Sequence, residues 1–403
     1  MAATAPAVPE TPSPSPTPSA PAPRRRGSRA LKGVGVAVGL VALLAGAVRL
    51  RYGGGTAYPD VSGMPLLPDS ALEVAAVSQE PVGNVAVSST GRLFFTIHPE
   101  SRPEGAKLLE WVDGKAVPYP NEGVQAKLFE TPLGVTIDSK DRLWTVDHGN
   151  HGAGTPRLLA FELATGHIAH EFVFPPDVAP LGSFFQDLRV DVTGDTVFIA
   201  DVGFWRRQPA LVVYDVEGQR ARRVLDGHAS VFPQDYIIHN PIKRMEFFGG
   251  LAALKAGVDG IAVDPSGEWV WFAAMNHDTV YRVRAADLKD ASLAPEELEK
   301  RLQAVGRKPL NDGLSADSAG NVLITDVEHG AVLRMSPEGK LETLVKSPRI
   351  RWPDAVSHGP DGWLYLADSA IPHQMLQPKA HIAANAPYYI YRFKPGIAGV
   401  AGM

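Results

Sequence analysis

The chain has 403 residues, with 39 glycines, 35 prolines, no cysteine and a formal net charge of −5. The lack of cysteine excludes disulfides, thiolate metal sites and a thiol nucleophile. Residues 1–52 hold seven basic residues and one acid (+6), which leaves −11 on residues 53–403. So acidic a folded part argues against binding to phosphate backbones, which requires lysine and arginine, and we expect no nucleic-acid partner.

The first fifty residues are expected to be a membrane-targeting segment. Residues 1–30 are rich in Pro and Ala and end in a basic run, a composition that predicts a disordered tail followed by a basic stop. An uncharged run from Gly33 to Val48 follows; as a helix its length is roughly 24 Å against a hydrocarbon core of ~30 Å. Extended to residues 31–50, with the flanking Lys32 and Arg49 reaching the interface, it predicts a transmembrane signal-anchor helix.

Basic residues before and after this helix predict its orientation. More of them precede the apolar run than follow it, which predicts a single-pass protein of the inner or plasma membrane with a cytoplasmic N-terminus and a periplasmic or extracellular remainder. The alternative is a signal peptide cleaved near Ala45–Ala47, which would give a secreted protein. Arg49 and Arg51 directly beyond that site favour an uncleaved anchor. Residues 51–70 are interpreted as a flexible linker.

Residues 71–403 carry one pattern six times: a hydrophobic strand, a turn and a second strand. The turn residues are Gly91, Asp141, Gly194, Gly267, Gly320 and Gly362, separated by 50, 53, 73, 53 and 42 residues. A period near fifty, with two clear strands and room for two more, predicts an all-β domain, a six-bladed β-propeller. An open α/β sheet would need helices between the strands, and these are missing.

The spacing also predicts how the ring closes and where it is interrupted. We expect the last blade to combine Pro387–Phe393 with Leu72–Val77. The long third interval predicts an insertion at 228–250. The fourth interval predicts a short helix at 294–305, with Pro295 at its first turn.

If the first strand of each copy is innermost, the starts of these strands surround the axis. Asp259, Asp312 and Asp354 hold this position in three copies. The equivalent residues in the other three are Gly83, Leu133 and Gln186. Three carboxylates would repel one another, and Ca²⁺ or another divalent cation binds such oxygen ligands, so one hypothesis is a metal site at Asp259, Asp312 and Asp354 with Asn84. The alternative is that each Asp caps its own turn through the backbone.

A second circle of acids follows the second strands and is expected to consist mainly of turn formers: Asp147, Asp201, Asp326 and Asp368. The candidate ligand-pocket residues are Asp187, Asp201, Trp205, Asn276, His277 and His148. His148 and His151 are interpreted either as a ligand pair or as surface hydrogen-bonding groups. Trp205 is interpreted either as part of a mouth for an aromatic or anionic ligand or as exposed loop decoration. The sequence has no nucleophile elbow, phosphate loop or helical zinc motif, which argues against a serine hydrolase, an NTPase and a zinc protease.

Several stretches resemble the major royal jelly/Yellow family, in particular its bacterial L-dopachrome tautomerase-related type. They include GRLFFTIHPESRPEGAKLLEW, DRLWTVDHGNHGAGTPRLLAFELATG and NDGLSADSAGNVLITDVEHGAV, and the resemblance extends roughly over Val82–Asp368. It implies a six-bladed propeller with tautomerase activity, amine binding in the channel, or no established activity. NDG at Asp312 and PDA at Asp354 are more distantly similar to the senescence-marker/gluconolactonase propellers, which implies a divalent cation on the axis. VDG at Asp259 fits that pattern less closely.

Two classes of function follow. The favoured one is an enzyme acting on a small molecule in the central pocket, either an isomerase of the L-dopachrome tautomerase kind or a lactone hydrolase. There Asp312 and Asp354 are the catalytic candidates that move a proton, and a divalent metal would polarise a carbonyl. The alternative is a non-catalytic protein that binds an aromatic amine or serves as an interaction scaffold.

Overall fold

The computed structural model describes residues 1–7, 9, 10, 12, 13, 15 and 27–403. The chain consists of two compact units, Met1–Val48 and Arg49–Met403. Helix α1 (Gly27–Tyr52) contains the stretch Gly33–Tyr52, which is long and apolar enough to cross a membrane. This is the candidate span expected from the sequence. The tail and basic stop predicted for residues 1–30 lie in part outside the described residues.

Six four-stranded antiparallel sheets form the blades of a propeller, which confirms the predicted fold. Blades 1 to 3 consist of β3 (Val82–Val87), β4 (Leu93–Ile97), β5 (Leu108–Val112) and β6 (Lys115–Pro118); β7 (Pro132–Ile137), β8 (Arg142–Asp147), β9 (Arg157–Glu162) and β10 (Ile168–Val173); and β11 (Phe185–Val190), β12 (Thr196–Asp201), β13 (Ala210–Asp215) and β14 (Arg220–Val224). Blades 4 to 6 consist of β18 (Val258–Val263), β19 (Trp269–Ala274), β20 (Thr279–Arg284) and β21 (Gln303–Arg307); β22 (Leu314–Ala316), β23 (Val322–Asp326), β24 (Ala331–Met335) and β25 (Leu341–Lys346); and β26 (Pro353–His358), β27 (Leu364–Asp368), β28 (Tyr388–Phe393) and β2 (Glu73–Ser78).

The ring closes as predicted, because β2 from the beginning of the unit pairs with β28 from its end. The innermost strands are the first of each copy, and every residue in them is buried. The six turn residues that define the repeat all have positive φ, between 54° and 85°. Glycine adopts this conformation without steric cost, which explains why five of the six are glycine.

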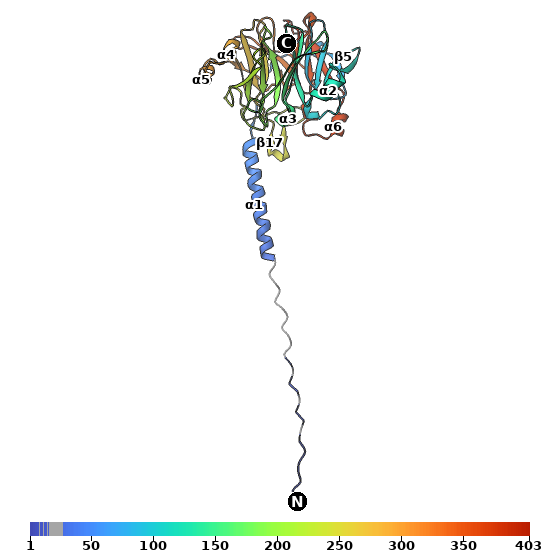
Figure 1. Ribbon diagram of the computed structural model, residues 1–403, viewed down its shortest axis with the longest axis vertical. Helices are drawn as coiled ribbons and strands as arrows, with labels where there is room; N and C mark the ends of the chain where they lie inside the picture. Colours follow the sequence, from blue (N-terminus) through green and yellow to red (C-terminus); the bar gives the residue numbers. More distant parts are fainter. Residues whose placement is uncertain (8, 11, 14, 16–26) are drawn as a thin grey trace. The chain divides into compact units, whose positions relative to one another are not determined.

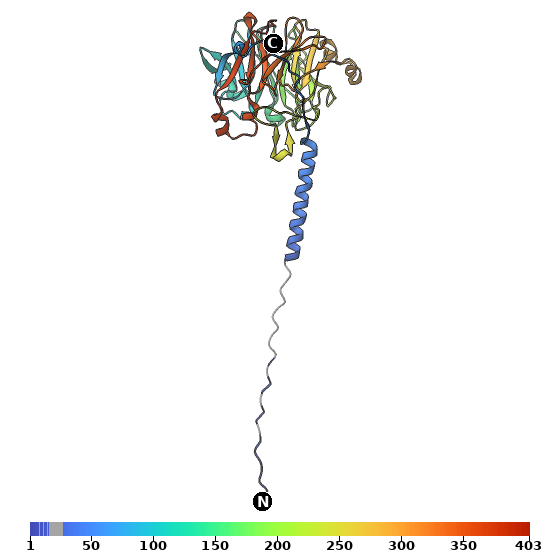
Figure 2. The ribbon, with the colours of Figure 1, turned by 180° about the vertical axis from the view of Figure 1, so that it is seen from behind.

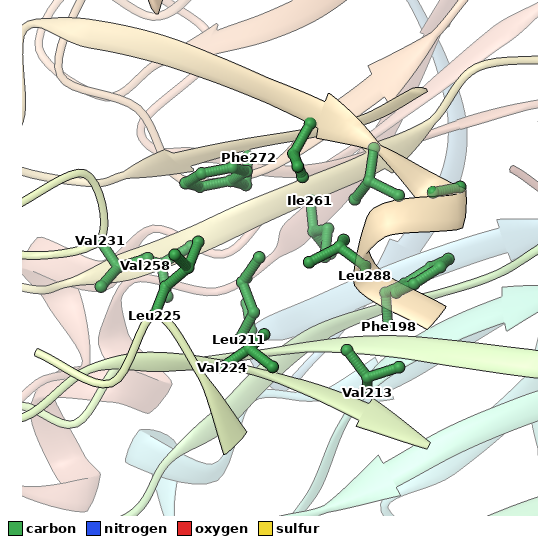
Figure 3. Packing of buried hydrophobic residues seen from close by; sticks show 14 of the residues in the cluster. Phe198, Leu211, Val213, Val224, Leu225, Val231, Val258, Ile261, Phe272 and Leu288 are labelled. Carbon is green, nitrogen blue, oxygen red and sulfur yellow. The ribbon is translucent and has the colours of Figure 1, made fainter. Parts of the chain in front are cut away.

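Neighbouring blades are held together by apolar side chains packed between their sheets. Figure 3 shows this for blades 3 and 4, where Phe198 and Leu211 face Ile261 and Phe272, and Leu288 covers the outer edge. Burying a side chain of this size stabilises the fold by about 1.5–3 kcal/mol. Contacts of this kind, repeated around the ring, fix the positions of the inner strands.

Glycines let the inner strands approach one another closely. A Cβ atom at Gly134, Gly260 or Gly313 would lie 2.5, 2.6 or 2.4 Å from a carbonyl oxygen of the next inner strand. Each glycine directly follows one of the strand-start residues on the axis, namely Leu133, Asp259 and Asp312. The close packing therefore brings those side chains together.

The remaining elements lie at the ends and outer edge of the propeller. They are β1 (Thr56–Ala57), α2 (Glu122–Leu128), α3 (Gly149–Gly152), β15 (Tyr236–Ile237), β16 (Glu246–Phe247), β17 (Ala252–Ala253), α4 (Ala285–Lys289), α5 (Pro295–Glu299) and α6 (Lys379–Ala384), with 3₁₀ turns η1 (Asp69–Ala71), η2 (Pro99–Ser101), η3 (Phe248–Gly250), η4 (Pro360–Gly362) and η5 (Ile371–His373). The predicted insertion forms β15 and the β16–β17 hairpin. Figure 1 shows α3 and β17 at one end of the propeller and the C-terminus at the other.

Two local predictions differ from the structure. The segment expected as a flexible linker is packed against the propeller: β1 pairs in parallel with β15, and buried Tyr58 donates a hydrogen bond to the Lys308 carbonyl at 2.8 Å. The helix expected at 294–305 ends at Glu299, because residues 303–307 pair with the edge of β20 as strand β21 instead.

The C-terminal segment lies across one end of the channel. Its backbone bonds to blade 2 through Ile137 N and Gly402 O at 3.0 Å, to blade 6 through His358 N and Met403 O at 2.9 Å, and to blade 5 through Ser318 N and Ala398 O at 2.8 Å. Met403 also packs on the cluster shared by blades 3 and 4. Both views place the C-terminus at the end of the propeller opposite the β16–β17 hairpin.

Candidate active site

A pocket with a cavity volume of about 120 Å³ opens at the end of the propeller where the inner strands begin. Its walls are largely apolar and come from the loop after β12, the β16–β17 hairpin and the segment between η5 and α6. The apolar lining residues are Phe184, Val202, Phe204, Trp205, Phe247, Phe248, Ala252, Leu254, Ala256, Met275, Trp352, Ile371, Met375 and Leu376. The polar lining residues are few: His98, Glu100, His151, Gln186, Asp259 and Asp312.

Asp312 and Asp259 form the polar floor of this pocket, and each is 2 % exposed. Trp352 Nε1 donates to Asp312 Oδ2 at 2.7 Å, and Gln186 Nε2 donates to Asp312 Oδ1 at 3.3 Å. These two side-chain donors hold the Asp312 carboxyl group in place.

More polar groups lie close to the floor. Asn84 donates through Nδ2 to Asp187 Oδ1, and its own Oδ1 accepts from Val85 N at 2.8 Å. Within the described part of the chain, three carboxyl oxygens here have no hydrogen-bond partner: Asp187 Oδ2, Asp259 Oδ1 and Asp354 Oδ2. Buried polar atoms are normally paired, so these oxygens indicate a site that has a ligand, ion or proton to accept.

Burial raises the pKa of every carboxyl group in this cluster. It raises the pKa of Asp187 to about 6 and that of Asp312 to about 7. Burial, reinforced by the charge of Asp312, raises the pKa of Asp259 and of Asp354 well above its usual range. The cluster therefore keeps its protons to a higher pH than exposed carboxyl groups do, and Asp312 is close to its midpoint at pH 7.

His98 lies on the wall next to this cluster. Burial lowers its pKa to about 4, so the imidazole is neutral at pH 7. Its Nδ1 accepts a hydrogen bond from Glu100 N at 3.1 Å, which leaves the ring proton on Nε2. Nε2 lies 3.9 Å from Asp354 Oδ2. His98 is therefore a hydrogen-bond donor to the site rather than a base.

Of the other residues predicted to line the pocket, some do so and others support the loops around it. Trp205 lines the pocket. Asp201 instead accepts from Phe184 N at 2.8 Å and from Gly203 N at 3.1 Å, and pairs with Arg223 at 2.6 Å. Its role is to shape the loops that carry Phe184 and Trp205.

Three more predicted pocket residues support the structure around the pocket: Asn276, His277 and His148. Asn276 bonds to the backbone of three residues, Tyr236, Leu254 and Ala256. His277 Nδ1 accepts from Thr279 N at 3.0 Å. His148 is 1 % exposed, so it is not a surface group, and its ring lies 4.3 Å from that of Phe184.

The sequence interpretation did not single out His98, Glu100, Phe184 or Trp352. Trp352 stands two residues before Asp354, on the loop that begins an inner strand, and this position was the available signal. His98 directly follows the second strand of the first copy, at the position that His148 holds in the second copy and Val202 in the third. Position in the repeat could therefore have placed it at this end of the channel.

Metal binding can be judged from the donor atoms. The cluster offers oxygen donors only, three of them unpaired, which suits a hard cation. Among the residues that the structure describes, one group of three acidic or histidine side chains has ligand atoms all within 4.8 Å of one another, and it consists of Asp60, Asp326 and His329 near the surface. The axial aspartates fit a cation by chemistry, without converging to that degree.

The model of the family described as Major royal jelly protein matches residues 131–353. The chain belongs to this family. No curated protein matches it. As a royal jelly family member it shares its fold with a luciferin-regenerating enzyme (11 % identity, TM-score 0.54, 82 % of this chain and 97 % of that one). It is likewise similar to the calcium-binding protein regucalcin of Agrobacterium tumefaciens (14 %, 0.51, 82 % and 98 %) and to a gluconolactonase of Xanthomonas campestris (12 %, 0.50, 85 % and 98 %). These likenesses confirm the propeller fold of this royal jelly family member.

Proposed function

We propose that this chain is an enzyme that moves a proton on a small, largely apolar molecule held in the central pocket. The observation that carries the proposal is a cluster of buried carboxyl groups with raised pKa at the floor of an otherwise apolar chamber. Strongly perturbed acids in a cleft are typical of catalytic sites. Family membership and the propeller fold support a small-molecule pocket without naming the reaction.

The two floor carboxyls divide the work. Asp312, with a pKa of about 7, accepts a proton from a carbon next to a carbonyl. Asp259, whose pKa burial also raises, donates a proton to the carbonyl oxygen. His98 Nε2–H stabilises the negative charge on that oxygen during the transfer. Delivery of a proton from Asp259 and capture of one by Asp312 amounts to a keto–enol tautomerisation of the substrate, and return of a proton from Asp312 to Asp259 restores the enzyme for the next turnover.

The apolar walls define the substrate class. Phe184, Phe204 and Trp205 offer flat surfaces to an aromatic ring, and the acid that stands among them on the wall is Glu100. A cyclised catechol with a carbonyl group fits this distribution. An apolar lactone is the second substrate class, in which the same carboxyl pair would activate water.

The test is a screen of full-length protein against cyclised catechols and lactones, with exchange of carbon-bound hydrogen in D₂O followed by NMR. Enzyme-dependent exchange next to a carbonyl is expected. Because exchange reports the first proton transfer, it reveals activity even when the product is unknown. Tight binding of an aromatic amine without exchange or turnover of any carbonyl compound would instead support the binding-protein alternative, which Glu100 and the aromatic wall favour.

A divalent cation is a separate proposal for the same floor, and it replaces the two-acid reaction, because a carboxylate that holds the ion gives up the proton which that reaction needs. Asp259, Asp312 and Asp354, with Asn84, would hold it through oxygen atoms, and it would supply a positive charge that polarises a carbonyl. Calcium is expected to raise the melting temperature of the protein at pH 8 and to have little effect at pH 5, because protons compete for the same oxygens.

Two variants distinguish an ion at the axial aspartates from an ion at the surface cluster. Asp354→Asn is expected to abolish the calcium-dependent rise, whereas Asp60→Asn, at the surface cluster, is expected to keep it. The reverse pattern would assign the ion to Asp60, Asp326 and His329. An unchanged response in Asp354→Asn would exclude the axial site.

We also propose that the chain is anchored by α1 with its propeller outside the inner or plasma membrane. The candidate span Gly33–Tyr52 and the excess of basic residues before it support this topology. Release of the propeller by cleavage after the apolar run is the alternative. N-terminal sequencing of the mature protein distinguishes the two.

A further inference from the structure

Large apolar side chains stand exposed around the mouth of the pocket. Trp205 is 54 % exposed, Phe248 is 71 % exposed and Leu376 is 55 % exposed, and all three line the pocket. They come from three separate loops, after β12, at the tip of the β16–β17 hairpin and between η5 and α6. Exposed aromatic groups gathered from several loops mark a surface that meets an apolar partner.

The first residues of the propeller unit are bonded to two of these loops. Three side chains donate hydrogen bonds to backbone carbonyls there: Arg49 Nη1 to Gly250 O at 2.6 Å, Arg51 Nη2 to Arg206 O at 3.1 Å, and Tyr52 Oη to Trp205 O at 2.9 Å. The ring of Tyr52 also lies 5.9 Å from that of Phe204 and 6.2 Å from that of Trp205. Residues 49–52 are therefore fixed beside the mouth.

The same four residues end the candidate membrane span. Residues 49–52 directly follow the apolar run and end the candidate span Gly33–Tyr52, so a span that ends at the membrane surface brings them to that surface by covalent connection alone. Tryptophan and tyrosine are enriched at the headgroup layer, and arginine is attracted to anionic headgroups. The mouth offers both kinds of side chain, in Tyr52 and Trp205 and in the exposed Arg49 and Arg51.

We propose that the aromatic rim, defined as Phe204, Trp205, Phe247, Phe248 and Leu376, docks into the headgroup layer of the bilayer that holds the anchor. The pocket then opens toward lipid, and its apolar walls continue an apolar path from the membrane. The inference rests on the membrane anchor and not on the proton chemistry, so either can fail without the other. The proposed partner is the lipid surface, and the test below distinguishes it from a second copy of the chain or another protein.

The experiment uses the full-length protein in vesicles of phosphatidylcholine and phosphatidylglycerol, after a carbonate wash has shown that it is an integral membrane protein. Tryptophan fluorescence is measured with lipids brominated near the headgroup. Quenching of the wild type is expected, and Trp205→Phe is expected to lose most of it. Phe248→Trp is expected to gain quenched emission, which keeps the test valid if Trp205→Phe folds poorly.

Trp363→Phe is the matched control, because Trp363 follows η4 at the opposite end of the propeller. It is expected to leave the quenching unchanged. Lack of bromolipid quenching in the carbonate-resistant wild type would overturn the proposal, as would its loss in Trp363→Phe. If Trp205 is shielded from both bromolipid and aqueous iodide, the rim is covered by protein, and the lipid assignment is wrong.

Discussion

Asp312→Asn is expected to slow turnover by about 10²–10⁴-fold, the usual contribution of a positioned general base, while the affinity for a pocket ligand changes little. Asparagine keeps the shape of the side chain, and its oxygen can still accept from Trp352 Nε1. The amide cannot take up a proton, so only the transfer step is lost. Single-turnover kinetics and ligand titration on the same preparation separate the two effects.

Asp317→Asn provides the control for this variant. Asp317 is also fully buried on the hairpin of blade 5, but it accepts hydrogen bonds from Ala319 N and Asn321 N at the far end of the inner strand. A normal rate per folded molecule is expected for it. If Asp312→Asn retains the wild-type rate, Asp312 is not the base, and the proposed mechanism is wrong.

Wild-type protein is expected to lose stability relative to Asp312→Asn as the pH rises from about 4 to about 7. Burial raises the pKa of Asp312 to about 7, so the folded state binds the proton more tightly than the unfolded state does. The free energy of unfolding therefore falls through this window, by at most about 1.4 kcal/mol per pH unit for one group, and the difference is constant above it. Urea unfolding of both proteins at several pH values measures this.

The comparison with the variant is needed because other buried groups oppose the trend. His98, His277 and His358 each have a pKa lowered by burial to about 4, so they make the folded state more stable as the pH rises from 4 to 6.5. They are present in both proteins and cancel in the difference. If the wild type instead gained stability relative to Asp312→Asn as the pH rose, Asp312 would be ionised in the folded state at acidic pH, contrary to the proposed arrangement.

The sixfold repeat could be predicted from the sequence because its turns require positive φ. Glycine occupies five of the six turn positions, and the spacing of these residues gives the period. The same period located Asp259, Asp312 and Asp354 on the axis, since one blade position is equivalent to another. The packing of Tyr58 and the conversion of residues 303–307 into a strand were not predictable, because each depends on a partner far away in the sequence. The same holds for the pocket walls: Phe248 and Leu376 are separated by more than a hundred residues, and no local pattern links them.

Only the structure distinguishes the acids of the pocket from those that shape the surrounding loops. Asp201 and Asp259 are both buried acids near the start or end of a strand, and the sequence gives them similar surroundings. What separates them is the number of backbone N–H groups within reach, since Asp201 accepts two of them and is paired with Arg223. A carboxyl group satisfied in this way is structural, and one left with an unpaired oxygen is available for chemistry.

In the described part of the chain, the carboxyl floor of the pocket, with the C-terminal segment across the far end of the channel behind it, leaves one mouth through which a molecule can enter. In the proposed reaction, substrate and product would use this same mouth, so the pocket would have to empty before it could be refilled. A product that resembles its substrate will then compete for occupancy, and its departure sets an upper limit on the catalytic rate.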